Sequence, residues 1–174
     1  MNRTQLRKMI LSALFLALCL LLPFLTGQIP QIGSMLSPMH IPVLLCGFVC
    51  GPLYGALIGL VAPILRFLLF SMPPIFPTGT AMAFELCTYG AMSGLLYMTF
   101  PRKTAYVYIA LVISMLAGRA VWGIVQYLLL TMKGSGFTFQ AFLAGAFINA
   151  WPGMILHIAI IPPLVMVLRR EKLA

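Results

Sequence analysis

Residues 81–97 read AMAFELCTYGAMSGLLY and place one acidic side chain, Glu85, inside an otherwise apolar run. A carboxylate at membrane depth costs about 2.5 to 3.5 kcal/mol, even on the insertion scales that give the lowest values. Polar or charged groups must offset this cost, and in a membrane only other parts of the protein can supply them. The run therefore predicts a helix packed against other helices that carry the partners of Glu85.

The composition of the whole chain indicates an integral membrane protein. Of the 174 residues, 62% are hydrophobic and 7% are charged, and the mean hydropathy is +1.07. A net charge of +9 could indicate nucleic-acid binding. The basic residues, however, mostly flank apolar runs instead of forming a patch on a polar surface, so no nucleic-acid partner is expected.

Six apolar runs predict six membrane-spanning helices, since a crossing helix needs about 20 apolar residues. The runs cover residues 9–27, 39–50, 53–71, 79–100, 105–131 and 138–168. The Gly51-Pro52 pair predicts a tight helical hairpin after the short second run. The last run is longer than one bilayer thickness, and WPG at 151–153 and Pro162-Pro163 offer places for a kink. We expect an all-α membrane protein, a compact six-helix bundle forming a single domain over residues 1–174.

The distribution of basic residues predicts the orientation of the bundle. With six spans, eight lysines and arginines fall on one face: Arg3, Arg7, Lys8, Arg102, Lys103, Arg169, Arg170 and Lys172. The opposite face carries Lys133 alone. The positive-inside rule then places both termini in the cytoplasm, and loops 28–38, 71–78 and 132–137 outside.

Polar and aromatic residues of the second to sixth spans are expected to converge near the midplane or in the outer half of the bundle. They are His40, Arg66, Glu85, Tyr89, Arg119, Trp122, Gln126 and Asn149. Arg119, Trp122 and Gln126 recur on one helical face. Such a convergence is typical of a ligand pocket, so these residues form the predicted substrate-binding site.

Structural roles for the same residues stay open. Buried charges must be paired in any protein, so Glu85 with Arg66 or Arg119 could only join helices. Two arginines against one glutamate leave one positive charge uncompensated. We expect Arg66 to pair with Glu85 and Arg119 to meet an anionic ligand. His157, placed deep toward the cytoplasm, is assigned a structural role.

Cysteines and small residues are read as packing features. The four cysteines, at 19, 46, 50 and 87, lie in apolar runs without zinc or redox spacing, so no disulfide and no metal site is expected. Gly51, Gly55 and Gly59 are spaced four apart, as are Ala13 and Ala17. This spacing lets two helices approach closely, and Ala13 and Ala17 could face either the bundle or a partner protein.

Several segments together resemble the substrate-binding S-component of an energy-coupling factor (ECF) transporter. They are the helix with the Ala13-x-x-x-Ala17 pair, MHIPVLLCGFVCGPLYGALIG (39–59), FPTGTAMAFELCTYGAMSGLLY (76–97) and GRAVWGIV (118–125). The resemblance covers nearly the whole chain. Characteristic signatures of the nicotinamide, thiamine, biotin and cobalt or nickel members are missing, and the chain looks closer to pantothenate-like and less well assigned members. A pyridine-type vitamin or a cobalamin precursor stays open as the substrate.

The resemblance implies a high-affinity vitamin-binding subunit of an ABC-type importer, multi-pass in a bacterial plasma membrane. It places Arg66, Glu85, Arg119 and Asn149 on pocket helices. It makes Ala13 and Ala17 the contacts to a transmembrane T-component, which two cytoplasmic ATPases drive. Because the chain lacks a G-x-x-x-x-G-K-[ST] loop, ATP would be used by those subunits, and no cofactor is expected in this chain.

Two other classes of function remain as alternatives. One is a self-sufficient small membrane transporter or channel. The other is an intramembrane enzyme, for which the candidates are few. Glu171 is the only acid besides Glu85, and Ser93 with His157 is the only serine–histidine pair worth naming. No catalytic residue is therefore assigned.

Overall fold

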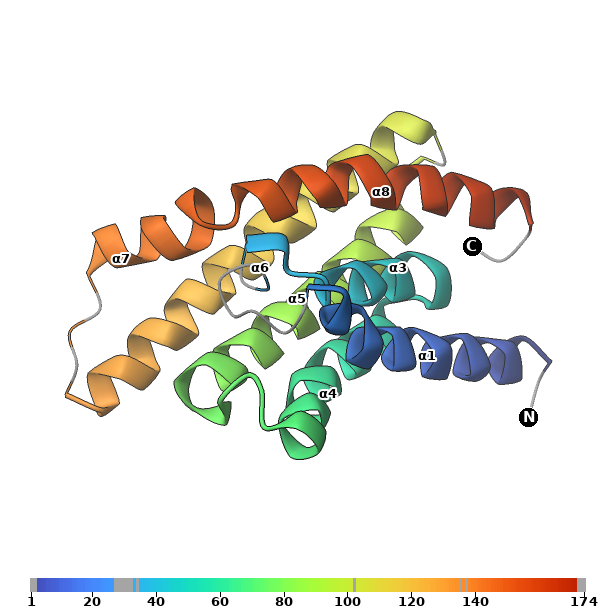
Figure 1. The fold of residues 1–174 in the computed structure, drawn as a ribbon. Helices are drawn as coiled ribbons and strands as arrows, with labels where there is room; N and C mark the ends of the chain where they lie inside the picture. The colour runs from blue at the N-terminus through green and yellow to red at the C-terminus, as the bar shows by residue number, and fades with distance from the viewer. Residues whose placement is uncertain are drawn as a thin grey trace.

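The computed structural model describes residues 3–26, 33, 35–101, 103–134, 136 and 138–171, and these are largely helical, with no β-strand among them. The elements, in chain order, are α1 (Arg3–Leu21), η1 (Leu22–Thr26), α3 (His40–Cys50), α4 (Pro52–Phe70), η2 (Ile75–Gly79), α5 (Thr80–Thr99), α6 (Thr104–Met132), α7 (Phe139–Leu143), η3 (Ala144–Ile148) and α8 (Trp151–Arg170). The predicted all-α fold class is confirmed, and each apolar run corresponds to one helix or one broken helix (Figure 1).

Not all of these helices are equally suited to cross a membrane. Four are long and apolar enough: Arg3–Leu25, Pro52–Phe70, Thr104–Met132 and Phe139–Arg170. Helix α3 has 11 residues, and at about 1.5 Å per residue it reaches only about half the thickness of the hydrocarbon core. Its first residue, His40, therefore lies well inside the bundle. Helix α5 is long enough but less apolar, because it carries Glu85 and other polar side chains on buried positions.

Helix α5 is the central element of the bundle. It packs against α3 and α4 on one side and against α6 on the other, while α1 covers α3 and α4, and α8 covers α3 and α6 (Figure 1). On the α1–α3 contact, the Ser12 Oγ and Cys46 Sγ atoms are 3.7 Å apart, and the Cys19 thiol donates to the Met39 carbonyl at 3.6 Å. Two of the cysteines thus serve helix packing.

Glycines bring α4 and α5 into backbone contact. A Cβ atom added to Gly90 of α5 would collide with the backbone of Gly55 in α4, and one added to Gly59 would collide with the backbone of Leu86. The four-residue spacing of Gly55 and Gly59 therefore serves contacts inside the bundle. Gly51 has a different role. It lies between α3 and α4 in their hairpin, with φ 99°, a conformation that favours glycine.

The last apolar run is broken where the sequence suggested. Helix α7 and segment η3 lead to a turn at Asn149 and Ala150, and α8 begins at Trp151, the first residue of WPG. Proline is well tolerated in the first turn of a helix, where its missing N–H has no intrahelical partner. The kink prediction is confirmed at this position, while Pro162 and Pro163 lie inside α8.

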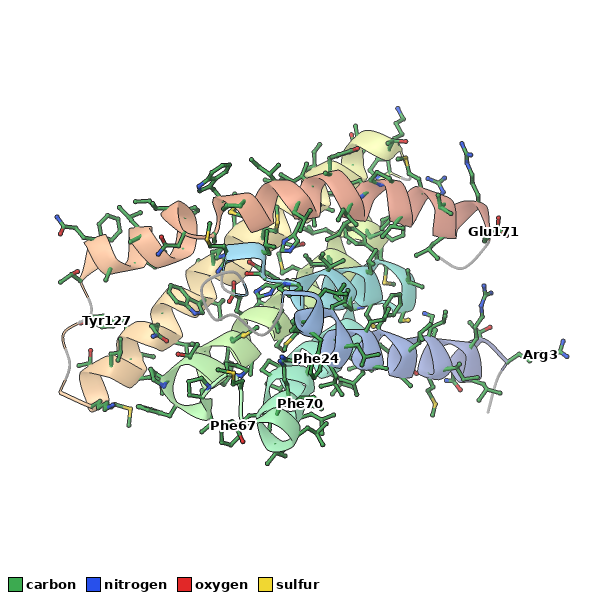
Figure 2. The ribbon with its side chains drawn as sticks, in the orientation of Figure 1. Arg3, Phe24, Phe67, Phe70, Tyr127 and Glu171 are labelled. Atoms are coloured by element: carbon green, nitrogen blue, oxygen red, sulfur yellow. The ribbon has the colours of Figure 1, made fainter. Side chains whose placement is uncertain are left out.

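The two ends of the described chain lie at the same end of the bundle. Figure 2 labels Arg3 and Glu171 there, with Tyr127 toward the opposite end. This arrangement agrees with an even number of crossings. The cytoplasmic placement of the termini stays a prediction, and it can be tested by labelling.

We expect a cysteine at Ser71, in a background without the four native cysteines, to react with a membrane-impermeant thiol reagent in intact cells. A cysteine at Thr104 should react only after permeabilisation, because the positive-inside rule places this end of α6 in the cytoplasm. Both positions are exposed. Labelling of Thr104→Cys from outside would contradict the six-span orientation. Ser34 and Ser135, two further outer positions by sequence, lie outside the described residues.

Candidate functional site

Glu85 is buried and lies among partners from two other helices as well as its own. The residue is 2% exposed. Its Oε1 atom accepts a hydrogen bond from the Tyr89 hydroxyl at 3.0 Å and lies 3.0 Å from Nη1 of Arg119. Nε2 of His40 is 3.6 Å from the same oxygen. The acid that the sequence singled out is thus paired with an arginine of α6.

The expected pairing of Glu85 with Arg66 is wrong. Arg119 reaches Glu85 because α5 and α6 pack closely, and Gly118 leaves room for the Tyr89 ring against α6, since a Cβ there would collide with that ring. Which arginine pairs with Glu85 depends on which faces of α4 and α6 meet α5. The spacing of residues within one helix does not determine those faces.

Arg66 instead joins the end of α1 to the end of α4. Its Nη1 donates to the Leu20 carbonyl at 2.7 Å, and its guanidinium carbon lies 5.4 Å from the ring centroids of Phe24 and Phe70. Figure 2 labels these two phenylalanines, which lie close to each other. The last carbonyls of a helix lack intrahelical partners and attract a cation. No contact among the described residues links Arg66 to Glu85, so its predicted role in substrate binding lacks support from this geometry.

Two histidines complete the surroundings of Glu85. The ring of His40 lies 5.3 Å from that of Tyr89 and is stacked on that of His157, with centroids 6.0 Å apart and planes 20° apart. His40 is 3% exposed and His157 is 2% exposed. We call His40, Glu85, Tyr89, Arg119 and His157 the Glu85 cluster; its members come from α3, α5, α6 and α8.

His157 was assigned a structural role from the sequence, although the signal for a site residue was present. That assignment took the depth of His157 from residue 138, the start of the last apolar run. Because the chain turns at Asn149 and α8 begins at Trp151, His157 is less than two turns from the start of its helix, as Glu85 is in α5. Taking WPG as a helix start would have placed both residues at similar depths.

Several polar atoms of the Glu85 cluster have no hydrogen-bond partner within the described protein. They are both ring nitrogens of His40, Nε2 of His157 and Nε of Arg119. A buried polar atom without a partner costs about 1 to 3 kcal/mol, so native proteins satisfy such atoms with water or ligand. The cluster therefore retains hydrogen-bonding capacity for a guest molecule.

The other predicted site residues, Trp122, Gln126 and Asn149, lie on α6 and at the turn before α8. Trp122 and Gln126 continue the α6 face of Arg119, and the Oε1 atom of Gln126 is buried without a hydrogen-bond partner. The Trp122 ring lies against Gly145 in η3, since a Cβ at Gly145 would be 2.7 Å from it. Asn149 is exposed at the turn before α8. The binding roles of these three residues stay predictions.

Ala13 and Ala17 lie on the exposed face of α1. The buried residues of this helix are Ser12, Phe15 and Cys19, which point to α3 and α4. The exposed face includes large apolar side chains: Leu6, Ile10, Leu14 and Leu21. The two alanines therefore do not pack inside the bundle, and they leave a shallow strip between larger residues.

The Glu85–Arg119 pair gives a quantitative expectation. Glu85→Gln and Arg119→Gln should each destabilise the purified protein by about 3 to 5 kcal/mol, because each change leaves a buried charge unpaired. The double variant should lose much less than the sum of the two single losses. The measurement is thermal stability in detergent. Arg66→Gln serves as the control: its effect should add to that of Glu85→Gln, and coupling between Arg66 and Glu85 would contradict the observed pairing.

Comparison with known families was made over the whole chain. A family model described as the ECF transporter, substrate-specific component, matches residues 7–165. The match includes the Glu85 cluster and the exposed face of α1 from Ile10 onward. Searches of curated proteins and of solved structures gave no match.

Proposed function

Because the chain belongs to the family of ECF transporter substrate-specific components, we propose that it captures a vitamin or vitamin precursor from outside the cell for ATP-driven uptake. The observation that carries this proposal is the Glu85 cluster, in which helices α3, α6 and α8 bury polar atoms that have no hydrogen-bond partner among the described residues. In an apolar membrane bundle such atoms are costly, so their retention favours binding of a polar guest.

The position of the cluster also suits a ligand that enters from one face. His40 begins the short helix α3, and the chain before it packs on the start of α8, where a Cβ at Gly153 would be 2.5 Å from the Met35 carbonyl. Residues 35–39 therefore lie between the start of α3 and the start of α8, and a ligand at the cluster would be held between these residues and α5.

Energy for transport is assigned to partner subunits. The partners proposed are a transmembrane T-component and two cytoplasmic ATPases, which would bind and hydrolyse ATP; no cofactor is proposed for this chain. The absence of a phosphate-binding G-x-x-x-x-G-K-[ST] loop supports this division of roles. The exposed strip at Ala13 and Ala17 supports a helix-to-helix contact with the T-component, since small residues let two helices approach closely in lipid.

The proposed cargo is a vitamin or a vitamin precursor, with pantothenate-like compounds as the first candidates from the resemblance. Gentle purification followed by mass spectrometry of the released small molecule tests this directly. Uptake of the identified compound should require co-expression of the T-component and both ATPases. Uptake by this chain alone would favour a self-sufficient transporter, and a chain that retains and binds no small molecule would refute the proposal.

A further inference from the structure

We propose that the part of the ligand held against the Glu85 cluster is an uncharged group of the carboxamide type, with a hydrogen-bond donor and acceptor side by side, and is not a carboxylate. This inference rests on the proposed function and narrows its substrate. It replaces the expectation of an anionic ligand, which depended on a free arginine in the site.

Among the described residues, neither Arg119 nor Arg66 is left free to meet an anion. Arg119 is 3.0 Å from the carboxylate of Glu85, and Arg66 is held at the Leu20 carbonyl between two phenylalanine rings. One guanidinium and one carboxylate make this pair neutral. A second carboxylate entering here would share one arginine with Glu85 and repel it, and like charges at short range in a buried site are strongly unfavourable.

The unpartnered atoms require both hydrogen-bond donors and acceptors from the ligand. Nε of Arg119 can only donate, whereas a neutral imidazole offers one donor and one acceptor. A carboxylate can only accept, so it would leave an acceptor nitrogen of a neutral imidazole, such as Nε2 of His157, without a partner. An ammonium group can only donate, and it would leave the N–H groups without partners. A carboxamide, lactam or ureido edge serves both kinds of atom.

These atoms are close enough for one small group to reach more than one of them. Nε2 of His40 and Nη1 of Arg119 lie 3.6 and 3.0 Å from the same atom, Oε1 of Glu85. The unpartnered Nε belongs to the same guanidinium as Nη1, and the ring of His157 stacks on that of His40. The amide edge would therefore lie beside the Glu85–Arg119 pair and against the imidazoles. In a pantothenate-like ligand, the internal amide rather than the terminal carboxylate would occupy this position.

Matched pairs of compounds test the inference on the purified chain in detergent. The pairs are nicotinamide and nicotinate, pantothenol and pantothenate, and biotinamide and biotin. Nicotinamide should bind at least as tightly as nicotinate, measured by calorimetry, because these two differ only in this group. In the other two pairs both members retain an internal amide or ureido group, so both members should bind wherever one does. If the cluster recognised a carboxylate, the neutral member of a pair would instead bind at least about thirtyfold more weakly than the acid. Nicotinate binding more than about tenfold tighter than nicotinamide would overturn the proposal.

Variants of the charged pair sharpen this test. Glu85→Gln leaves Arg119 without its carboxylate, so the affinity for the acid relative to the neutral member should rise by about tenfold or more. Glu85→Gln/Arg119→Gln keeps the cluster neutral and should retain the wild-type preference. The double variant also allows the preference for the neutral member to be measured if Glu85→Gln alone does not fold. An unchanged ratio in a folded Glu85→Gln protein would contradict the proposal.

The outcome remains decisive if none of the six compounds binds. The molecule released from the purified protein then settles the question: a carboxamide, lactam or ureido group supports the inference, and a carboxylate without such a group overturns it. The proposed function fails separately, if no small molecule is retained or if uptake does not depend on the partner subunits.

Discussion

Replacing Gly90 with valine is expected to prevent the bundle from forming. Gly90 of α5 lies directly against the backbone of Gly55 in α4, and even a Cβ atom there would collide with that backbone. Ordinary overpacking costs about 1 to 3 kcal/mol because side chains can move aside. Here backbone meets backbone at the central helix, so the loss should exceed about 4 kcal/mol. The measurement is the yield of monodisperse protein and its thermal stability.

Gly136 offers a matched control for this substitution. A Cβ at Gly136 would meet no atom within 4 Å, so Gly136→Val should change stability by less than about 0.5 kcal/mol. Gly55→Val should be as damaging as Gly90→Val, because the two glycines form one contact. A Gly90→Val protein with wild-type stability would show that α4 and α5 do not approach each other this closely.

Tryptophan at Ala17 or Ala13 is expected to abolish uptake while leaving the isolated protein folded and able to bind its ligand. Both alanines are exposed on α1, so a large side chain meets no atom of the bundle. It would, however, separate two helices that must approach closely at a small-residue strip. Uptake and co-purification with the T-component should be lost, and ligand affinity and thermal stability should stay within about twofold and about 0.5 kcal/mol of wild type.

Ile124→Trp is the matched control for α1. Ile124 is 60% exposed on α6, so it tests the effect of an added tryptophan on a lipid-facing helix away from the strip. This variant should retain uptake. If Ala17→Trp instead lost ligand affinity and stability together, α1 would have to pack against its own bundle through this face.

The helices themselves follow from local properties of the sequence. Apolar runs in a membrane must form helices because every backbone group needs a partner within the segment. Gly51-Pro52 ended one helix and began the next, and WPG began α8, as their backbone preferences require. A buried acid needs partners wherever it lies, so the central position of Glu85 was also predictable from one run of sequence.

The identity of those partners was decided only by the tertiary structure. Arg66 and Arg119 were equally plausible by charge, and the outcome depended on how α4 and α6 are rotated against α5, which glycines such as Gly55, Gly90 and Gly118 determine through packing. His157 joined the cluster because α8 begins at the break and packs on α3. Rotation and depth are set by contacts between segments far apart in the chain. Periodicity within one segment therefore indicates which residues share a face, but only the packed bundle decides what that face meets.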